Sequence, residues 1–153
     1  MKKAFILTIV LVFLCGFGVS EQEEPDLNPL YIMANQLNGR ARPNKKSMIE
    51  ARFDHDDEVF PTGKWSADRQ WIEVFGGETG TVWCNVDYLT EREDVFTVYS
   101  LNKGGIRVRS KPGAGKVTGT IRREQRVEIT QVVMGYGRCK KGWVDLSYFI
   151  EGE

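Results

Sequence analysis

The sequence has few of the residues from which catalytic and metal sites are built. Its 153 residues include one histidine, His55, and three cysteines, Cys15, Cys84 and Cys139. One histidine with two or three cysteines does not complete a closed structural zinc site without help from carboxylates. Charge of one sign is also lacking, because 21 basic side chains balance 21 acidic ones and no overall field favours nucleic acid or a membrane. We therefore predict no metal and no cofactor.

Long hydrophobic runs are absent except at the N-terminus. The basic residues of Met1–Lys3 precede the apolar run Ala4–Leu14, and small residues then lead to Ser20 and the acidic stretch Glu21–Glu24. This order of charge, apolar run and small residues is typical of a secretory signal peptide. We predict a signal peptide over residues 1–20, with cleavage after Ser20, and a secreted or cell-envelope protein.

Two alternatives for this N-terminal segment stay open. It is an uncleaved anchor if the segment is retained, although its apolar run is slightly shorter than the roughly 20 residues that a membrane helix needs. It is a lipoprotein signal if Cys15 is lipidated, although Leu14 stands where such signals have a small residue. All three routes export the protein, and only a retained or lipidated segment would make a membrane its partner.

An internal repeat organises the rest of the chain. Trp83–Leu89 and Trp143–Phe149 match residue by residue in character, and Arg40–Pro43 matches Arg109–Pro112. Further matches are Phe53 and Val59 with Ile121 and Val127, and Leu37-Asn38 with Leu101-Asn102. We predict two domains, 31–89 and 95–149, joined by the charged linker 90–94 and preceded by an acidic lead-in over 21–30.

Each unit has the periodicity of short strands. Runs such as Phe96–Tyr99 and Val127–Thr130 are β-branched or aromatic, and glycine and proline separate them. Gly76-Gly77 and Lys141-Gly142 are hairpin signals, and no stretch after residue 20 has the pattern of an amphipathic helix. We predict an all-β fold of two small β-barrels in tandem, because closure into a barrel removes exposed edge strands.

The motifs of both units resemble bacterial SH3 domains. Tyr31–Pro43 is similar to the family's opening motif, a tyrosine-valine pair followed by Leu-Asn-Val-Arg-Ser-Gly-Pro, although Gly39 replaces the valine. The second unit keeps Val108–Gly113 and closes with Gly142-Trp143-Val144, similar to the family's Gly-Trp-Val ending, which the first unit lacks. The resemblance implies two SH3-like barrels that bind cell-wall peptides or serve as targeting modules.

The one acidic cluster with a histidine, Asp54–Glu58, resembles a metal or acid–base site. Its counterpart in the second unit is Arg122–Arg126, which has the opposite charge between the same apolar residues. A segment that tolerates charge inversion between two copies is predicted to be a solvated turn.

The cysteines give no sign of a nucleophile either. Neither Cys84 nor Cys139 is predicted at a helix N-terminus, where a thiolate would be stabilised, and the length leaves no room for a catalytic domain. We therefore predict that the protein is not an enzyme. In an oxidising compartment two cysteines often pair, so a disulfide between Cys84 and Cys139 and two separately buried thiols both stay open.

Aromatic side chains are the best candidates for binding, because they supply contact area at a small entropic cost. Trp83 recurs as Trp143 and Tyr88 recurs as Tyr148, which favours the same core position in both units. Trp65 has no counterpart and lies in the polar stretch 62–69, which predicts a loop contact. The predicted ligand-binding residues are Trp65, Trp71, Tyr136, Trp143 and Tyr148.

Charge is divided unequally between the units. Residues 95–149 have eleven basic and three acidic side chains, a net charge of +8, whereas residues 31–89 have seven and nine, a net of −2. This division fits attraction between the barrels or an anionic partner of the second barrel.

Two functions follow from the sequence. The first is a non-enzymatic exported module that binds peptidoglycan, a cell-wall peptide or a cell-envelope protein. The second is a protein–protein scaffold or an inhibitor of a secreted enzyme. Nucleic acid is not an expected partner, because export would separate the protein from it.

Overall fold

A computed structural model describes residues 28–76 and 80–152 of the protein. The predicted signal peptide and its cleavage site after Ser20 lie outside the described residues, as does Gly77 of one hairpin signal. Among the described residues, no helix combines the length and hydropathy that crossing a membrane requires.

The described chain is all-β, as predicted, with two 3₁₀ turns as its helical elements. The strands of the first unit are β1 (Leu30–Ile32), β2 (Gln36–Arg40), β3 (Ile49–Asp54), β4 (Glu58–Val59), β5 (Pro61–Trp65), β6 (Trp71–Phe75), β7 (Thr81–Asn85) and β8 (Leu89–Thr90). Those of the second unit are β9 (Phe96–Ser100), β10 (Ile106–Lys111), β11 (Ala114–Ile121), β12 (Arg126–Ile129), β13 (Gln131–Val133), β14 (Tyr136–Cys139), β15 (Gly142–Asp145) and β16 (Phe149–Glu151). The turns η2 (Val86–Tyr88) and η3 (Leu146–Tyr148) precede the last strand of each unit.

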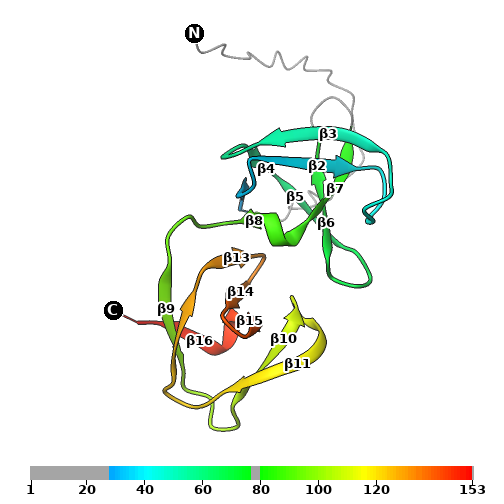
Figure 1. Ribbon diagram of the computed structural model, residues 1–153. Coiled ribbons are helices and arrows are strands. Elements are labelled where there is room, and N and C mark those ends of the chain that lie inside the picture. The colour runs from blue at the N-terminus through cyan, green and yellow to red at the C-terminus, as the bar shows by residue number, and fades with distance from the viewer. Residues whose placement is uncertain (1–27, 77–79, 153) are drawn as a thin grey trace, which may run out of the picture.

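The two units have the same topology, which confirms the tandem arrangement of two small barrel-like folds (Figure 1). The first combines a three-stranded sheet, β4-β1-β8, with a five-stranded sheet, β3-β2-β7-β6-β5. The second repeats both orders as β12-β9-β16 and β11-β10-β15-β14-β13. The recurring 3₁₀ turn is capped in the same way, because Asn85 and Asp145 each accept a hydrogen bond from the backbone two residues on.

The pairing register shows which residues are equivalent and corrects one predicted match. Arg40 pairs with Trp83 and Arg109 pairs with Trp143, as the repeat predicts. Counting back along β2 and β10 then makes Leu37 equivalent to Ile106, and the predicted match of Leu37 with Leu101 is wrong. Burial decides the register, because Leu37 and Ile106 are 6% and 5% exposed whereas Leu101 is 50% exposed in the β9–β10 connection.

The segment that contains His55 is a turn with the same hydrogen bond in both units. The Asp54 amide donates to Asp57 Oδ2 at 2.7 Å, and the Arg122 amide donates to Gln125 Oε1 at 3.0 Å. The turn therefore uses a side-chain oxygen at one position, from Asp57 or Gln125, and tolerates either charge at the others because these are solvent-exposed.

Two apolar clusters form the cores, and the first extends across both units. The first contains strand residues of β1, β2, β6 and β7 together with Val133 and Trp143 of the second unit. The second is centred on Val108, Ile129 and Val144. Because side chains of the second unit complete the core of the first, the two barrels are packed on each other rather than joined only by a linker.

Hydrogen bonds between β8 and β13 reinforce this packing (Figure 1). The buried Gln131 side chain donates from Nε2 to the carbonyls of Val86 at 2.7 Å and Leu89 at 2.6 Å. The Val132 amide donates to Thr90 Oγ1 at 3.2 Å, and the Glu91 amide donates to the Val132 carbonyl at 2.7 Å. The segment predicted as a charged linker is thus partly built into the interface.

Both cysteines are free thiols in the structure, Cys84 in the first cluster and Cys139 in the second. Burial raises the pKa of Cys84 to about 12, so that its reactive thiolate is scarce near neutral pH. We predict that iodoacetamide does not modify Cys84 in the folded protein at pH 8 within an hour, and modifies it in 8 M urea. Peptide mapping by mass spectrometry measures this, and a cross-linked Cys84–Cys139 peptide would contradict it.

Candidate binding clefts

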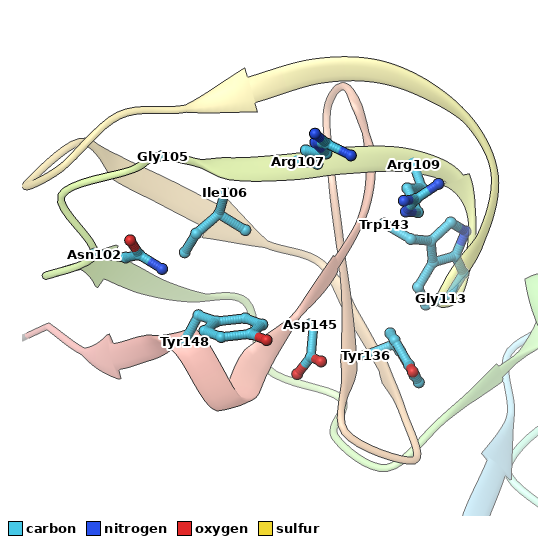
Figure 2. Close-up of a pocket in the computed structure, with 10 residues that line it drawn as sticks. All are labelled: Asn102, Gly105, Ile106, Arg107, Arg109, Gly113, Tyr136, Trp143, Asp145 and Tyr148. Carbon is cyan, nitrogen blue, oxygen red and sulfur yellow. The ribbon is translucent and has the colours of Figure 1, made fainter.

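The second unit has a cleft of about 420 Å³ that contains three of the predicted binding residues (Figure 2). Strand β10, the β9–β10 connection and the paired strands β14 and β15 form its walls, and η3 closes one side. In Figure 2, Asp145 lies between Tyr148 and Tyr136. The lining residues are Asn102, Gly105, Ile106, Arg107, Arg109, Gly113, Tyr136, Trp143, Asp145 and Tyr148.

The first unit has a cleft of about 340 Å³ at the same place in its fold. It is lined by Ala34, Gln36, Leu37, Asn38, Arg40, Lys45, Trp71, Asn85 and Tyr88. The strand registers and the 3₁₀ turns pair the residues of the two clefts as Leu37 with Ile106, Asn38 with Arg107, Arg40 with Arg109, Trp71 with Tyr136, Asn85 with Asp145 and Tyr88 with Tyr148. We call the two sites the first and second aromatic clefts.

The exposure of the aromatic residues differs from what their recurrence predicts. Trp143 is 3% exposed and fills a core position, whereas its counterpart Trp83 is only half-buried, so the shared core position holds for one of the two tryptophans. Tyr88 and Tyr148 are 47% and 54% exposed, so the prediction that they fill a core position is wrong. Both are the last residue of a 3₁₀ turn, and in both units this position places the tyrosine in the lining of the cleft. Recurrence here marks a shared site rather than a shared core.

Charge is distributed differently in the two clefts. The second contains Arg107, Arg109 and one acid, Asp145. The Asp145 carboxylate already accepts hydrogen bonds from the Ser147 amide at 3.0 Å and the Ser147 hydroxyl at 2.6 Å, which fixes its position. In the first cleft Asn85 replaces this acid, and Arg40 and Lys45 are its cations. Both clefts therefore offer an aromatic rim beside cationic donors.

A side chain of the first unit holds Tyr136 of the second cleft. Arg69 donates from Nη2 to the Tyr136 hydroxyl at 3.0 Å and from Nε to the Pro112 carbonyl at 3.2 Å. Its guanidinium carbon lies 4.5 Å from the centroid of the Trp65 ring, and the Trp65 and Tyr136 rings meet edge to face at 6.1 Å. Gly113 leaves room for this contact, since a Cβ there would lie 2.6 Å from the Tyr136 hydroxyl.

The prediction that Trp65 lies in a polar loop is wrong. It is the last residue of β5, it is half-buried, and it packs against the first core cluster and across the domain interface. The polar sequence around it reflects an exposed hairpin, whereas Trp65 itself faces the second unit. Trp65 therefore lies outside the lining of both clefts and supports the second through Tyr136.

The predicted binding residues include Trp71, Tyr136, Trp143 and Tyr148 of the cleft linings but not Tyr88, and they include none of the basic residues. Arg107 and Arg109 were read only as part of the net charge, although Arg109 was matched with Arg40 in the repeat. The recurrence of arginine at positions 40 and 109, together with the recurring tyrosines Tyr88 and Tyr148, was the signal in the sequence that could have identified these basic residues. Asn102, which the sequence pairs wrongly with Asn38, and Gly105 also line the second cleft.

The one histidine and the two described cysteines lie outside both aromatic clefts. Within residues 28–76 and 80–152, no group of three or more His, Cys, Asp or Glu side chains is placed to hold a metal ion. His55 contacts Asp56 at 2.7 Å in an exposed turn, and both cysteines are buried in the cores. Stacking on tyrosine and charge-assisted hydrogen bonds to arginine are what the clefts can offer a ligand.

No family model matches the chain, and no curated protein matches it. Among solved structures, it is similar to NlpC2 from Trichomonas vaginalis, with 16% identity, a TM-score of 0.35 and coverage of 81% of this chain and 48% of that one. It is also similar to NlpC1 from the same organism, with 16% identity, a TM-score of 0.35 and coverage of 92% of this chain and 50% of that one. For the CBD of endolysin LysPBC5 the identity is 18%, the TM-score is 0.34, and the match covers 84% of this chain and 96% of that one. The chain thus spans about half the length of the two NlpC structures.

Proposed function

We propose that the protein is an exported, non-enzymatic binding module whose two aromatic clefts recognise a cell-wall peptide of peptidoglycan. The observation that carries this proposal is the recurrence of one cleft in both units, with a rim tyrosine and an arginine at equivalent positions. Core residues recur because a fold must be filled, but half-exposed tyrosines have no such reason to recur.

The lining of the clefts suits a peptide with a carboxylate. A tyrosine ring at the rim supplies a flat apolar face for a peptide side chain or backbone, and it loses little conformational entropy on binding. Arg109 in the second cleft and Arg40 in the first provide donors for a carboxylate. Asp145, present only in the second cleft, adds an acceptor for an amine, so the two clefts would differ in the peptide they prefer.

Two clefts on one packed body also suit a repeating polymer. Once one cleft is occupied, the second meets a neighbouring peptide at high effective concentration, so weak single sites give strong retention. Because the units share a core cluster and the β8–β13 hydrogen bonds, the separation of the clefts is fixed rather than set by a flexible linker.

We predict that Tyr148→Ala lowers the affinity of the protein for purified peptidoglycan sacculi about tenfold, as truncation of a binding hot spot does. Tyr88→Ala has a similar effect, and the double variant loses more than either because avidity is lost. Co-sedimentation at low and at high salt measures this. Phe75→Ala is the matched control, because Phe75 is an aromatic that is 58% exposed outside both clefts.

Saturable retention at high salt that falls in both tyrosine variants and not in Phe75→Ala supports the proposal. Absence of retention, or equal loss in the control, contradicts it. Crosslinking in intact cells then identifies a protein partner, as expected for a scaffold or an inhibitor.

A further inference from the structure

We propose that a third cleft, separate from the two aromatic ones, binds a phosphate group that carries an apolar chain. This cleft has a volume of about 580 Å³ and lies in the second unit between β12, the end of β11 and the β14–β15 hairpin. Four cations, Arg126, Arg138, Lys140 and Lys141, line it. We call it the basic cleft.

The cations of the basic cleft are largely uncommitted. Among the described residues, Arg126, Lys140 and Lys141 take part in no ion pair. Arg138 is the committed one, because its Nη1 lies 3.3 Å from Asp87 of the first unit and donates to Gln131 Oε1 at 3.4 Å, and its guanidinium carbon lies 5.7 Å from the centroid of the Trp143 ring. Glu128 is the one acid in the lining. Like charges that gather without partners cost free energy, which an anionic ligand would offset.

The hairpin fixes two of these charges in place. Cys139 pairs with Gly142, so Lys140 and Lys141 are the two residues of a tight turn. Their backbone is held by the flanking strands, and both side chains start from the rim of the cleft.

The floor of the basic cleft is apolar. Ile121 and Cys139, 2% and 7% exposed, and the half-buried Val127 lie beneath the charged rim. A simple inorganic anion would leave this floor in contact with water. A ligand with an apolar chain next to its charge would cover the floor and gain free energy in proportion to the apolar area buried.

The first unit lacks the charge of this site, so the fold itself does not require it. The strand registers make Glu58 equivalent to Arg126 and Glu73 equivalent to Arg138. Phe75 occupies the position of Lys140. Three cationic positions of the second unit are therefore acidic or apolar in the first, which gives the net charge of +8 over residues 95–149 a definite location.

Phosphate matches this arrangement better than a single carboxylate does. Its three or more acceptor oxygens can bind several donors at once, and arginine binds phosphate through two parallel hydrogen bonds. One carboxylate would leave most of the charge of Arg126, Lys140 and Lys141 without a partner. A membrane phospholipid and a soluble phosphate amphiphile share this chemistry, and experiment distinguishes the two sources.

The test compares three probes on the protein expressed from its full reading frame. The probes are dihexanoyl phosphatidic acid below its micelle concentration, inorganic phosphate, and vesicles of phosphatidylglycerol and phosphatidylcholine against vesicles of phosphatidylcholine alone. Calorimetry measures the soluble probes and co-sedimentation measures the vesicles. We expect the soluble amphiphile to bind at least ten times more tightly than inorganic phosphate.

Two double variants with the same change in net charge distinguish binding in the basic cleft from general electrostatic attraction to the second unit. Lys140→Glu/Lys141→Glu reverses the rim, and Lys103→Glu/Lys116→Glu reverses two exposed lysines of the same unit outside the cleft. We expect the rim variant to lose at least tenfold in affinity and the control to stay within about twofold. Thermal unfolding checks that both variants are folded, as substitutions of exposed residues predict.

Each outcome decides the proposal. Amphiphile binding that the rim variant alone abolishes supports it, with the vesicle arm showing whether the source is a membrane surface or a soluble molecule. Equal loss in both variants, equal affinity for inorganic phosphate, or no binding of any probe overturns it. Retention on sacculi is an independent measurement, because Tyr88 and Tyr148 lie outside the basic cleft.

Discussion

Gln131→Leu will lower the free energy of unfolding by about 3 kcal/mol, although leucine fills nearly the same volume as glutamine. The Gln131 side chain, 3% exposed, donates to two carbonyls of the first unit at 2.7 and 2.6 Å. Leucine removes both donors, so the carbonyl of the fully buried Leu89 loses this partner and the Val86 carbonyl keeps only the hydrogen bond from the Leu89 amide. Each unmet buried polar group costs roughly 1–3 kcal/mol.

Gln125→Leu is the matched control for this substitution. The Gln125 Oε1 atom accepts one hydrogen bond, from the Arg122 amide, in an exposed turn where water can replace it. We expect the control to lose no more than about 0.5 kcal/mol. Urea unfolding followed by tryptophan fluorescence measures both variants, and equal losses would show that the interface hydrogen bonds of Gln131 contribute little.

The core shared by the two units also determines how many unfolding transitions we expect. Because Val133 and Trp143 of the second unit complete the core of the first, we expect a single cooperative transition in the unmodified protein. If Gln131→Leu weakens the β8–β13 contact enough, the units unfold in two steps. Two steps already in the unmodified protein would contradict the shared core.

The repeat was the part of the fold that the sequence predicted best, and the reason is physical. Trp83 and Trp143 pair with equivalent arginines, and Val59 and Val127 pair with equivalent residues of β1 and β9. Val59 and Trp143 are buried and Trp83 and Val127 are half-buried, so packing keeps these positions apolar in both copies. A match that rested on a short exposed sequence, Leu101-Asn102, had no such constraint and was wrong.

The candidate sites were predicted less completely, because they depend on contacts between distant residues. Trp65 reads as a loop residue beside its polar neighbours, and only the packing of the two units shows that it supports Tyr136. The basic cleft combines Arg126 with the Lys140-Lys141 turn, which are separate in sequence. The net charge of +8 over residues 95–149 indicated that cations gather in the second unit. A net charge does not show which of these side chains lie close together in the fold.

One departure from the bacterial SH3 motif has a compensating change across the sheet. Gly39 stands where Val108 stands in the second unit, and Val82 stands where Gly142 stands. A Cβ on Gly39 would lie 2.6 Å from Val82 Cγ2, so Val82 occupies the space that a valine at position 39 would need. Each unit thus places one valine and one glycine on these neighbouring strands, with their positions exchanged.

Gly142 tolerates no side chain because of its own backbone conformation and close contacts, and Gly142→Ala will lose at least about 3 kcal/mol of stability. Gly142 has a φ of 141°, which L residues rarely adopt. A Cβ there would lie 2.4 Å from the Arg109 carbonyl oxygen and 2.9 Å from Thr118 Oγ1. The carbonyl belongs to the backbone of β10 where Arg109 pairs with Trp143, so the clash is relieved only by separating the two strands.

Gly135→Ala separates the clash from the backbone strain. Gly135 also has a positive φ, 79°, but a Cβ there would meet nothing within 4 Å. This control should cost only the strain of a left-handed residue, about 1–2 kcal/mol. Urea unfolding midpoints measure both variants.

Because Arg109 and Trp143 also line the second aromatic cleft, the folded fraction of Gly142→Ala should bind sacculi more weakly than Gly135→Ala does. Equal stabilities for the two variants would mean that strands β10 and β15 can move apart at Gly142 with no loss of stability. The sequence would then need glycine at position 142 only for its backbone conformation.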